Sequence, residues 1–445
     1  MRETRKMASL GRRGALLLPV VLGGCGLWDR WFGENKTPMP GTRIAIATQS
    51  HGLEVDDKGA RVVLPPPVGN ADWPQAGGNP SHAMGHLQVG DTLQTAWRAD
   101  IGEGGGYRRK ITAQPVVNGG QVFTMDSDAT LTAYNVANGA RLWRLDTQVK
   151  GDRSSNVGGG IGVDGDVLYA GTGRAELLAL EAGSGKIRWR KPVSTPVRSA
   201  PTIADGRVFV ITLDNQLQAF AVDDGRRLWG FQATTPDTSV LGLPAPAYAD
   251  GLVVGGFGSG DLVALRAATG SVAWSDNLGA ARGRTSLTDL SSIHGLPVVA
   301  DGRVYAGSLG GLVVSLDLRT GRRLWERDVA SAATPWLAGD WLFLLDTNGQ
   351  VAAITRAEGR VAWVSQLQQF EDEKKKEDPI YWKGPVLAGD RLILGSSNAM
   401  AVAMSPYTGD ILGQQKLPGA MSVEPCVAGG TVYVITDEAN LIALR

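Results

Sequence analysis

Histidine is scarce in this sequence, and its spacing limits the chemistry that the chain can support. The four histidines are His51, His82, His86 and His294. A helix would place His82 and His86 on one metal ion, but Pro80 and the nearby glycines oppose a helix there. The sequence also lacks an HExxH motif, paired CxxC motifs and a glycine-rich phosphate loop. We therefore expect no metal site, no cofactor and no catalysis.

The two cysteines, Cys25 and Cys426, have different surroundings. Cys25 ends a Leu-Gly-Gly-Cys sequence that follows a basic segment and a short apolar stretch, Ala15 to Leu22, which is too short to span a bilayer. This arrangement resembles the lipobox of bacterial lipoproteins. The resemblance implies a signal peptide over residues 1–24 and a lipid on Cys25, the alternative being an ordinary secretory signal. Cys426 lies in a strand-like run and is expected to be a core residue.

The overall composition excludes one class of partner and indicates one class of fold. The chain has 44 basic and 44 acidic residues, a net charge of zero, and no basic block outside the N-terminal segment. Nucleic acid is therefore not an expected partner. The 60 glycines, together with few helix-length amphipathic patterns, predict many short strands and tight turns.

An internal repeat specifies the fold more closely. Each unit begins near a proline, continues through two apolar runs, and ends in Gly-x-x-x-Trp. A unit contains four short strands in about 40 to 50 residues, which is typical of a β-propeller blade. The alternative is a helical solenoid, which β-branched runs cut by Asp-Gly turns oppose. The first strands begin near Pro115, Ile161, Pro201, Pro246, Pro297, Pro335, Pro385 and Pro425, which predicts eight blades.

The last repeat stops at Arg445 without a fourth strand, whereas Leu93 to Trp97 resembles a fourth strand with no blade before it. We therefore predict an all-β, eight-bladed β-propeller of four-stranded blades over residues 72–445. Its ring is closed by the N-terminal strand, which completes the last blade. Residues 25–71 are expected to form a lipidated tether. The repeat tryptophans are expected to pack between blades, although the seventh repeat has Gly413 instead.

The repeat core, seen best at Ala264 to Trp274 and Ser315 to Trp325, resembles that of pyrroloquinoline quinone (PQQ) dehydrogenases. This resemblance leaves open a PQQ-dependent or otherwise ligand-binding propeller. Those enzymes carry adjacent cysteines, which this sequence lacks.

The lipobox, the tether and the repeats together resemble the BamB family, the propeller lipoproteins of the machinery that inserts β-barrel proteins into the bacterial outer membrane. The resemblance extends from about Asp72 to Arg445. It implies a noncatalytic scaffold, lipid-anchored at the periplasmic face of the outer membrane. Its implied partners are the periplasmic POTRA domains of the BamA insertase, other assembly subunits and unfolded outer-membrane proteins.

In that family the docking surface lies on two neighbouring loops, which correspond here to Thr235 to Pro244 and Ala281 to Leu296. The first loop has an uncharged apolar tip, as the core of an interface prefers. Where other members carry an arginine and two aspartates, this sequence has Leu241, Ser292 and His294, so the salt-bridged contact is not implied. The alternative is that both loops only fold over the propeller face. The residues implied in partner binding are Thr238, Val240, Leu241, Leu243, Asp289, Leu290, Ser292 and His294.

A third long connection, Gln366 to Lys383, contains the densely charged run Glu371 to Asp378. Mixed charge of this density predicts a solvated, mobile loop and not a binding site.

Overall fold

The computed structural model describes residues 52–56, 60–106, 109–148, 156–236, 241–279 and 291–445. Within these ranges the chain forms 34 β-strands and no helix. Consequently, this part of the chain offers no helix of the length and apolar character needed to cross a membrane.

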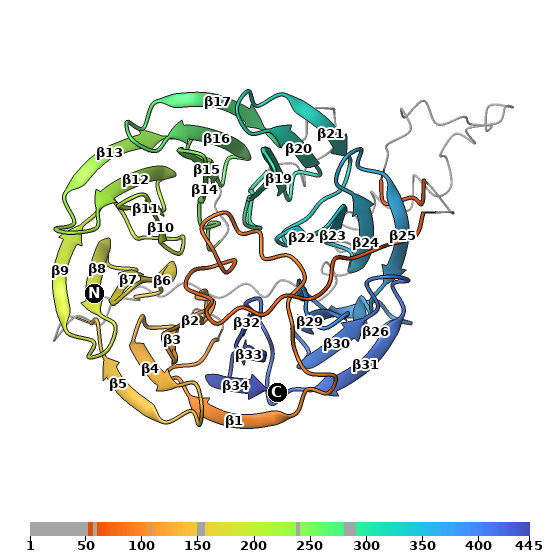
Figure 1. The fold of residues 1–445 in the computed structure, drawn as a ribbon, viewed down its shortest axis with the longest axis horizontal. Helices are drawn as coiled ribbons and strands as arrows, with labels where there is room; N and C mark the ends of the chain where they lie inside the picture. Colours follow the sequence, from red (N-terminus) through yellow and green to blue (C-terminus); the bar gives the residue numbers. More distant parts are fainter. Residues whose placement is uncertain (1–51, 57–59, 107–108, 149–155, 237–240, 280–290) are drawn as a thin grey trace, which may run out of the picture. The chain divides into compact units, whose positions relative to one another are not determined.

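The strands form eight four-stranded antiparallel sheets, which are the blades of a β-propeller ring (Figure 1). Consecutive strands within a blade are joined by short turns, except for the third and fourth strands of the last blade, and the eight first strands begin within a few residues of the predicted positions. Blades 1 to 4 contain β2 (Val116–Asn118), β3 (Gln121–Met125), β4 (Leu131–Asn135), β5 (Arg141–Leu145); β6 (Gly160–Asp164), β7 (Val167–Gly171), β8 (Glu176–Glu181), β9 (Ile187–Pro192); β10 (Thr202–Ala204), β11 (Arg207–Ile211), β12 (Gln216–Ala221), β13 (Arg227–Gln232); and β14 (Ala247–Ala249), β15 (Leu252–Gly256), β16 (Asp261–Arg266), β17 (Val272–Asn277).

The second half of the ring repeats this order and ends with the blade that closes it. Blades 5 to 8 contain β18 (Val298–Ala300), β19 (Arg303–Gly307), β20 (Val313–Asp317), β21 (Arg323–Arg327); β22 (Trp336–Ala338), β23 (Trp341–Leu345), β24 (Gln350–Thr355), β25 (Val361–Gln366); β28 (Trp382–Leu387), β29 (Leu392–Ser396), β30 (Met400–Met404), β31 (Ile411–Lys416); and β32 (Cys426–Ala428), β33 (Thr431–Ile435), β34 (Asn440–Leu444), β1 (Thr95–Asp100).

The predicted ring closure is confirmed, because β1 pairs antiparallel with β34. Trp97 lies opposite Ala443, and the backbones of Gln94 and Arg445 exchange hydrogen bonds of 2.7 and 2.9 Å. The fourth strand of blade 8 therefore comes from the other end of the propeller sequence. Closure of this kind joins the first and last blades through backbone hydrogen bonds.

The tryptophans that end the repeats join neighbouring blades, as predicted. Each indole Nε1 donates a hydrogen bond of 2.7 to 3.1 Å to a carbonyl that follows the third strand of the next blade. Each ring also packs on the turn glycine of that blade, so closely that an added Cβ would lie 2.5 to 2.7 Å from an indole carbon. We call each such contact a seam. The seven pairs are Trp97–Gly139, Trp143–Gly185, Trp189–Gly225, Trp229–Gly270, Trp274–Gly321, Trp325–Gly359 and Trp363–Gly409.

The position of the missing eighth tryptophan has a structural reason. Gly413 lies on β31, and the blade that follows it is blade 8. In blade 8 the third strand, β34, is not joined to the fourth strand, β1, by a turn, because β1 lies far upstream in the sequence. Blade 8 therefore has no turn glycine on which a tryptophan at position 413 could pack.

The segment of residues 70–87, which we call the belt, runs across the centre of the ring before the first blade begins (orange trace in Figure 1). It forms hydrogen bonds with all eight blades, in their order round the ring starting from blade 8. Its partners are Val427 and Gly429, then Val117, Val163, Ile203, Tyr248, Val299, Trp336 and finally Leu387. One segment therefore ties the whole ring together.

The belt is buried as well as hydrogen-bonded. Trp73 has no exposed surface, and its ring stacks on that of Trp336 at a centroid distance of 6.3 Å. His82 adopts a left-handed conformation with φ of 61°, and its Nδ1 lies 2.7 Å from the Pro297 carbonyl oxygen. The later part of the expected tether also lies on the propeller, since Val62 is buried in the core cluster that includes Trp73.

The charged run Glu371 to Asp378 differs from the predicted mobile loop. It forms most of a small hairpin of β26 (Phe370–Asp372) and β27 (Glu377–Pro379). The run is exposed, as expected, and Lys375 forms ion pairs with Asp372 and Glu377. Lys376, in the turn between the two strands, has a left-handed backbone with φ of 56°.

Candidate functional site

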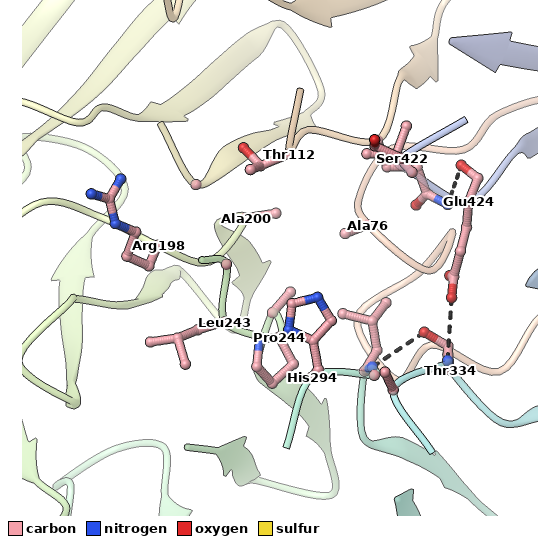
Figure 2. A pocket seen from close by; sticks show the side chains of 18 of the residues that line it. Ala76, Thr112, Arg198, Ala200, Leu243, Pro244, His294, Thr334, Ser422 and Glu424 are labelled. Atoms are coloured by element: carbon pink, nitrogen blue, oxygen red, sulfur yellow. Dashed lines mark hydrogen bonds between the residues drawn. The ribbon is translucent and has the colours of Figure 1, made fainter. Parts of the chain in front are cut away.

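A cavity of about 270 Å³ lies where the chain enters the first strands of the blades (Figure 2). Its lining comes from all eight blades and from one belt residue, Ala76. The belt bonds mainly to residues within the first strands, whereas the cavity is lined mainly by residues just before them, with Lys383 on β28 as an exception. The cavity therefore lies on the ring axis, next to the belt.

Several of these lining residues occupy the same position of the repeat, directly before its proline. In six of the eight repeats the first strand is preceded by X-Pro, and in all six the X residue lines the cavity. This position is occupied by Gln114, Ala200, Ala245, Leu296, Thr334 and Glu424. These residues were not among those predicted from the sequence. The residue before the repeat proline was the signal that could have found them.

The charged side chains that line the cavity are mainly basic. Lys110, Arg198 and Lys383 carry positive charge, and Glu424 is the acidic residue of the described lining. Lys110 is exposed, whereas Arg198, Lys383 and Glu424 are half-buried. The lining therefore has an excess of positive charge, in a site where screening by water is reduced.

Arg198 is held at the edge of blade 3. Its Nη1 donates a 2.5 Å hydrogen bond to the Val157 carbonyl, and its own carbonyl accepts one from the Leu243 amide at 2.8 Å. The Nε atom is buried and has no partner within the described residues. Burial lowers the pKa of the guanidinium, since no described acid offsets the cost of desolvation.

Glu424 is anchored on the opposite side of the cavity. Its Oε1 accepts a hydrogen bond from the Thr334 amide at 3.2 Å, and the Gln114 side-chain amide donates to its carbonyl at 3.3 Å (Figure 2). Burial raises the pKa of its carboxyl, and the Thr334 amide and the Lys383 charge act in the opposite direction. The carboxylate is therefore fixed in position.

Lys383 lies on β28, and its ammonium has no hydrogen bond or ion pair within 4 Å among the described residues. Burial lowers its pKa, while the more distant charges of Glu424 and Asp437 act in the opposite direction. A desolvated ammonium with no close partner favours the approach of an anion.

His294 completes the polar lining. Its pKa is lowered to about 4, mainly by burial and also by the charge of Lys383, while a hydrogen bond with the Gly242 backbone acts in the opposite direction. The imidazole is therefore neutral at pH 7. Its Nδ1 is buried and has no partner in the part of the chain that the structure describes.

The residues expected to bind a partner are found in several environments. Leu241 is 40% exposed, and Leu243 is half-buried with its amide bonded to Arg198. Ser292 is buried, and its hydroxyl bonds locally to the Ile293 carbonyl at 3.4 Å. His294 faces the cavity (Figure 2). Thr238, Val240, Asp289, Leu290 and the lipidation candidate Cys25 lie outside the described residues.

The remaining chemistry-bearing residues contribute to packing. His86 Nδ1 lies 2.8 Å from the Pro65 carbonyl oxygen, and its Nε2 accepts a hydrogen bond from the Asp390 amide at 3.1 Å. Among the described residues, no group of three or more His, Cys, Asp or Glu side chains is arranged to hold a metal ion. Cys426 is fully buried on β32, as predicted.

Comparison with known proteins identifies the family. A model of the family described as outer membrane protein assembly factor BamB matches residues 90–156 and 127–365. The chain belongs to the BamB family. One relative, the BamB of Yersinia pestis, is 29% identical over 300 residues, which cover 66% of this chain and 75% of that protein.

Solved structures support the fold. The crystal structure of BamB from Moraxella catarrhalis matches with a TM-score of 0.67 and 22% identity, covering 79% of this chain and 99% of that one. A europium-containing methanol dehydrogenase matches with the same TM-score, 0.67, at 13% identity, covering 82% of this chain and 90% of that one. At such identities the likeness shows the propeller fold alone and carries no activity across.

Proposed function

We propose that this chain is an outer-membrane protein assembly factor that acts as a noncatalytic scaffold. The observation that carries this proposal is the match to the BamB family over residues 90–365, which includes blades 1 to 6. The relative from Yersinia pestis carries the same assembly-factor description. A closed ring tied by a belt is well suited to present loops rigidly to other proteins.

The proposed partners are the POTRA domains of a BamA-like insertase, other subunits of the assembly machinery, and unfolded outer-membrane proteins. The proposed docking face is formed by the loops that contain Leu241 and His294. These loops are neighbours, since a Cβ on Gly242 would lie 3.5 Å from His294 Cε1. Leu241 is the most exposed of the described candidates, so we assign it the central contact. Ser292 is buried and would position the loop.

The proposed location is the periplasmic face of the outer membrane. A signal peptide at residues 1–24 would be removed, and a lipid on Cys25 would anchor the chain through the segment up to residue 71. The Cys25→Ala variant is expected in the soluble periplasmic extract, whereas the parent protein is expected in the outer-membrane fraction. Retention of the variant in the membrane fraction would contradict the lipid anchor.

The docking proposal is tested by capturing the POTRA domains from the same cell on the full chain. We expect the parent to bind and Leu241→Asp to reduce affinity about tenfold or more, because a charge would enter an apolar contact. Leu142→Asp is the matched control, since Leu142 is 46% exposed but lies on β5. Failure of the parent to bind would contradict the scaffold proposal, whereas equal binding by Leu241→Asp would move the docking face elsewhere.

A further inference from the structure

We propose that the cavity on the ring axis is a binding site for an organic anion that carries one carboxylate group and an apolar body. This proposal does not depend on the docking of the POTRA domains, because it rests on Arg198, Lys383 and Glu424, although Leu241 and His294 of the proposed docking loops also line the cavity. It assigns a ligand-binding role to residues within and just before the first strands.

The positive side of the site consists of Arg198 and Lys383, which both carry unpartnered donor atoms. The Lys383 ammonium has no hydrogen bond or ion pair among the described residues, and Arg198 Nε is likewise unpartnered there, although Arg198 Nη1 bonds to the Val157 carbonyl. Both side chains line the same cavity. A guanidinium and an ammonium both form short, charge-assisted hydrogen bonds with carboxylates. A bound carboxylate would therefore satisfy groups that are costly to bury alone.

Glu424 limits the charge of the ligand. Its carboxylate shares the cavity and is held in place by the Thr334 amide. A ligand with negative charge at both ends would place one charge against this carboxylate, whereas a single carboxylate can bind on the side of Arg198 and Lys383. The site therefore favours a monocarboxylate over a polycarboxylate, and its apolar lining favours an organic anion over inorganic phosphate.

The rest of the lining defines the body of the ligand. Apolar side chains of Leu243, Pro244, Leu296 and Val423 line the same cavity. A volume of about 270 Å³ is slightly below the range of pockets that take drug-sized molecules. The ligand is therefore small, and two sources could supply it: a free short-chain carboxylic acid or the carboxyl terminus of a polypeptide.

Calorimetric titration of the full chain at pH 7 tests the proposal with four probes. Hexanoate is expected to bind, and hexanol and inorganic phosphate are expected to bind at least tenfold more weakly. An N-acetylated tetra-alanine with a free carboxyl group would distinguish the two sources. Tighter binding of the peptide than of hexanoate would indicate a chain terminus, and the reverse order would indicate a free acid.

Lys383→Met separates a ligand-binding role from a structural role. Methionine preserves length and removes a desolvated charge, so the melting temperature of the ligand-free variant should stay the same or rise. Hexanoate affinity should nevertheless fall about tenfold or more. Lys416→Met is the control, because Lys416 is exposed on β31 and does not line the cavity.

Glu424→Gln should change affinity in the other direction, because it removes the repelling charge while keeping an acceptor for the Thr334 amide. Hexanoate should bind this variant more tightly than the parent, and phosphate should gain even more. The proposal is overturned if hexanoate does not bind the parent, if phosphate or hexanol binds as tightly, or if Lys383→Met leaves hexanoate affinity unchanged.

Discussion

Two different devices hold the propeller together, the seams and the belt. The seams repeat around the ring, and each joins one blade to the next through an indole that packs on a turn glycine. The belt occurs once and forms hydrogen bonds with every blade. Stabilisation by the seams is therefore distributed, whereas stabilisation by the belt is concentrated in one segment. A local defect in a seam should affect two blades, but a defect in the belt should affect the whole ring.

The largest loss of stability is expected from the substitution Trp73→Ala in the belt. Trp73 is fully buried, pairs with Val117 and stacks on Trp336. The substitution should lower the free energy of unfolding by about 3 to 5 kcal/mol, as is usual for a buried tryptophan. Denaturant titration would measure the loss. Val68→Ala is the control, because Val68 is 67% exposed in the neighbouring segment and should change stability by less than about 0.5 kcal/mol.

The belt should also make stability depend on pH. Burial lowers the pKa of His82 from 6.5 to about 4, so the unfolded chain binds a proton that the folded chain excludes. The stabilisation is fully present above about pH 6.5 and is lost as the pH falls toward 4, by on the order of 3 kcal/mol.

His82→Asn tests this pH dependence. Asparagine tolerates the left-handed backbone but does not titrate in this range. Denaturation of both proteins between pH 7 and 4.5 should show a smaller loss of stability for the variant. Part of the pH dependence should persist, because burial also lowers the pKa of His294 to about 4. Identical pH profiles would show that His82 takes up no extra proton on unfolding.

A single seam is expected to contribute less to the free energy of unfolding than the belt does. Gly270→Ala would place a Cβ 2.6 Å from Trp229 at a φ of +73°, whereas Gly302→Ala has nearly the same φ, +70°, and meets nothing within 4 Å. The control should lose about 1 kcal/mol from backbone strain alone. Gly270→Ala should lose about 1 to 3 kcal/mol more, because the indole must move. Equal losses would show that seam packing adds nothing to the backbone effect.

The smallest change in stability is expected at Gly413, where the seam between blades 7 and 8 is missing. Gly413 has no atom within 4 Å of an added Cβ, and blade 8 has no turn glycine beside it. Gly413→Trp should therefore change the free energy of unfolding by less than about 0.5 kcal/mol. A gain of 1 kcal/mol or more would contradict this expectation, because it would mean that a tryptophan can form a seam without the turn glycine.

The sequence by itself determined the blades, their number, the closing strand and the seams. These features follow from a repeated local pattern, in which strand alternation, turn glycines and Gly-x-x-x-Trp recur about every 40 to 50 residues. The sequence also showed that the seventh repeat has Gly413 where the other repeats have tryptophan. The identity of the family followed from the repeat together with the N-terminal motif.

Only the tertiary structure decided the roles of the belt and the cavity. Residues 70–87 contain no repeat, and one of their hydrogen-bond partners, Val427, lies 357 residues from Asn70 in sequence. Arg198, Lys383 and Glu424 belong to three different blades, and closure of the ring brings them to one axis. A local pattern can specify a strand or a turn, but residues distant in sequence meet only when the whole ring has closed.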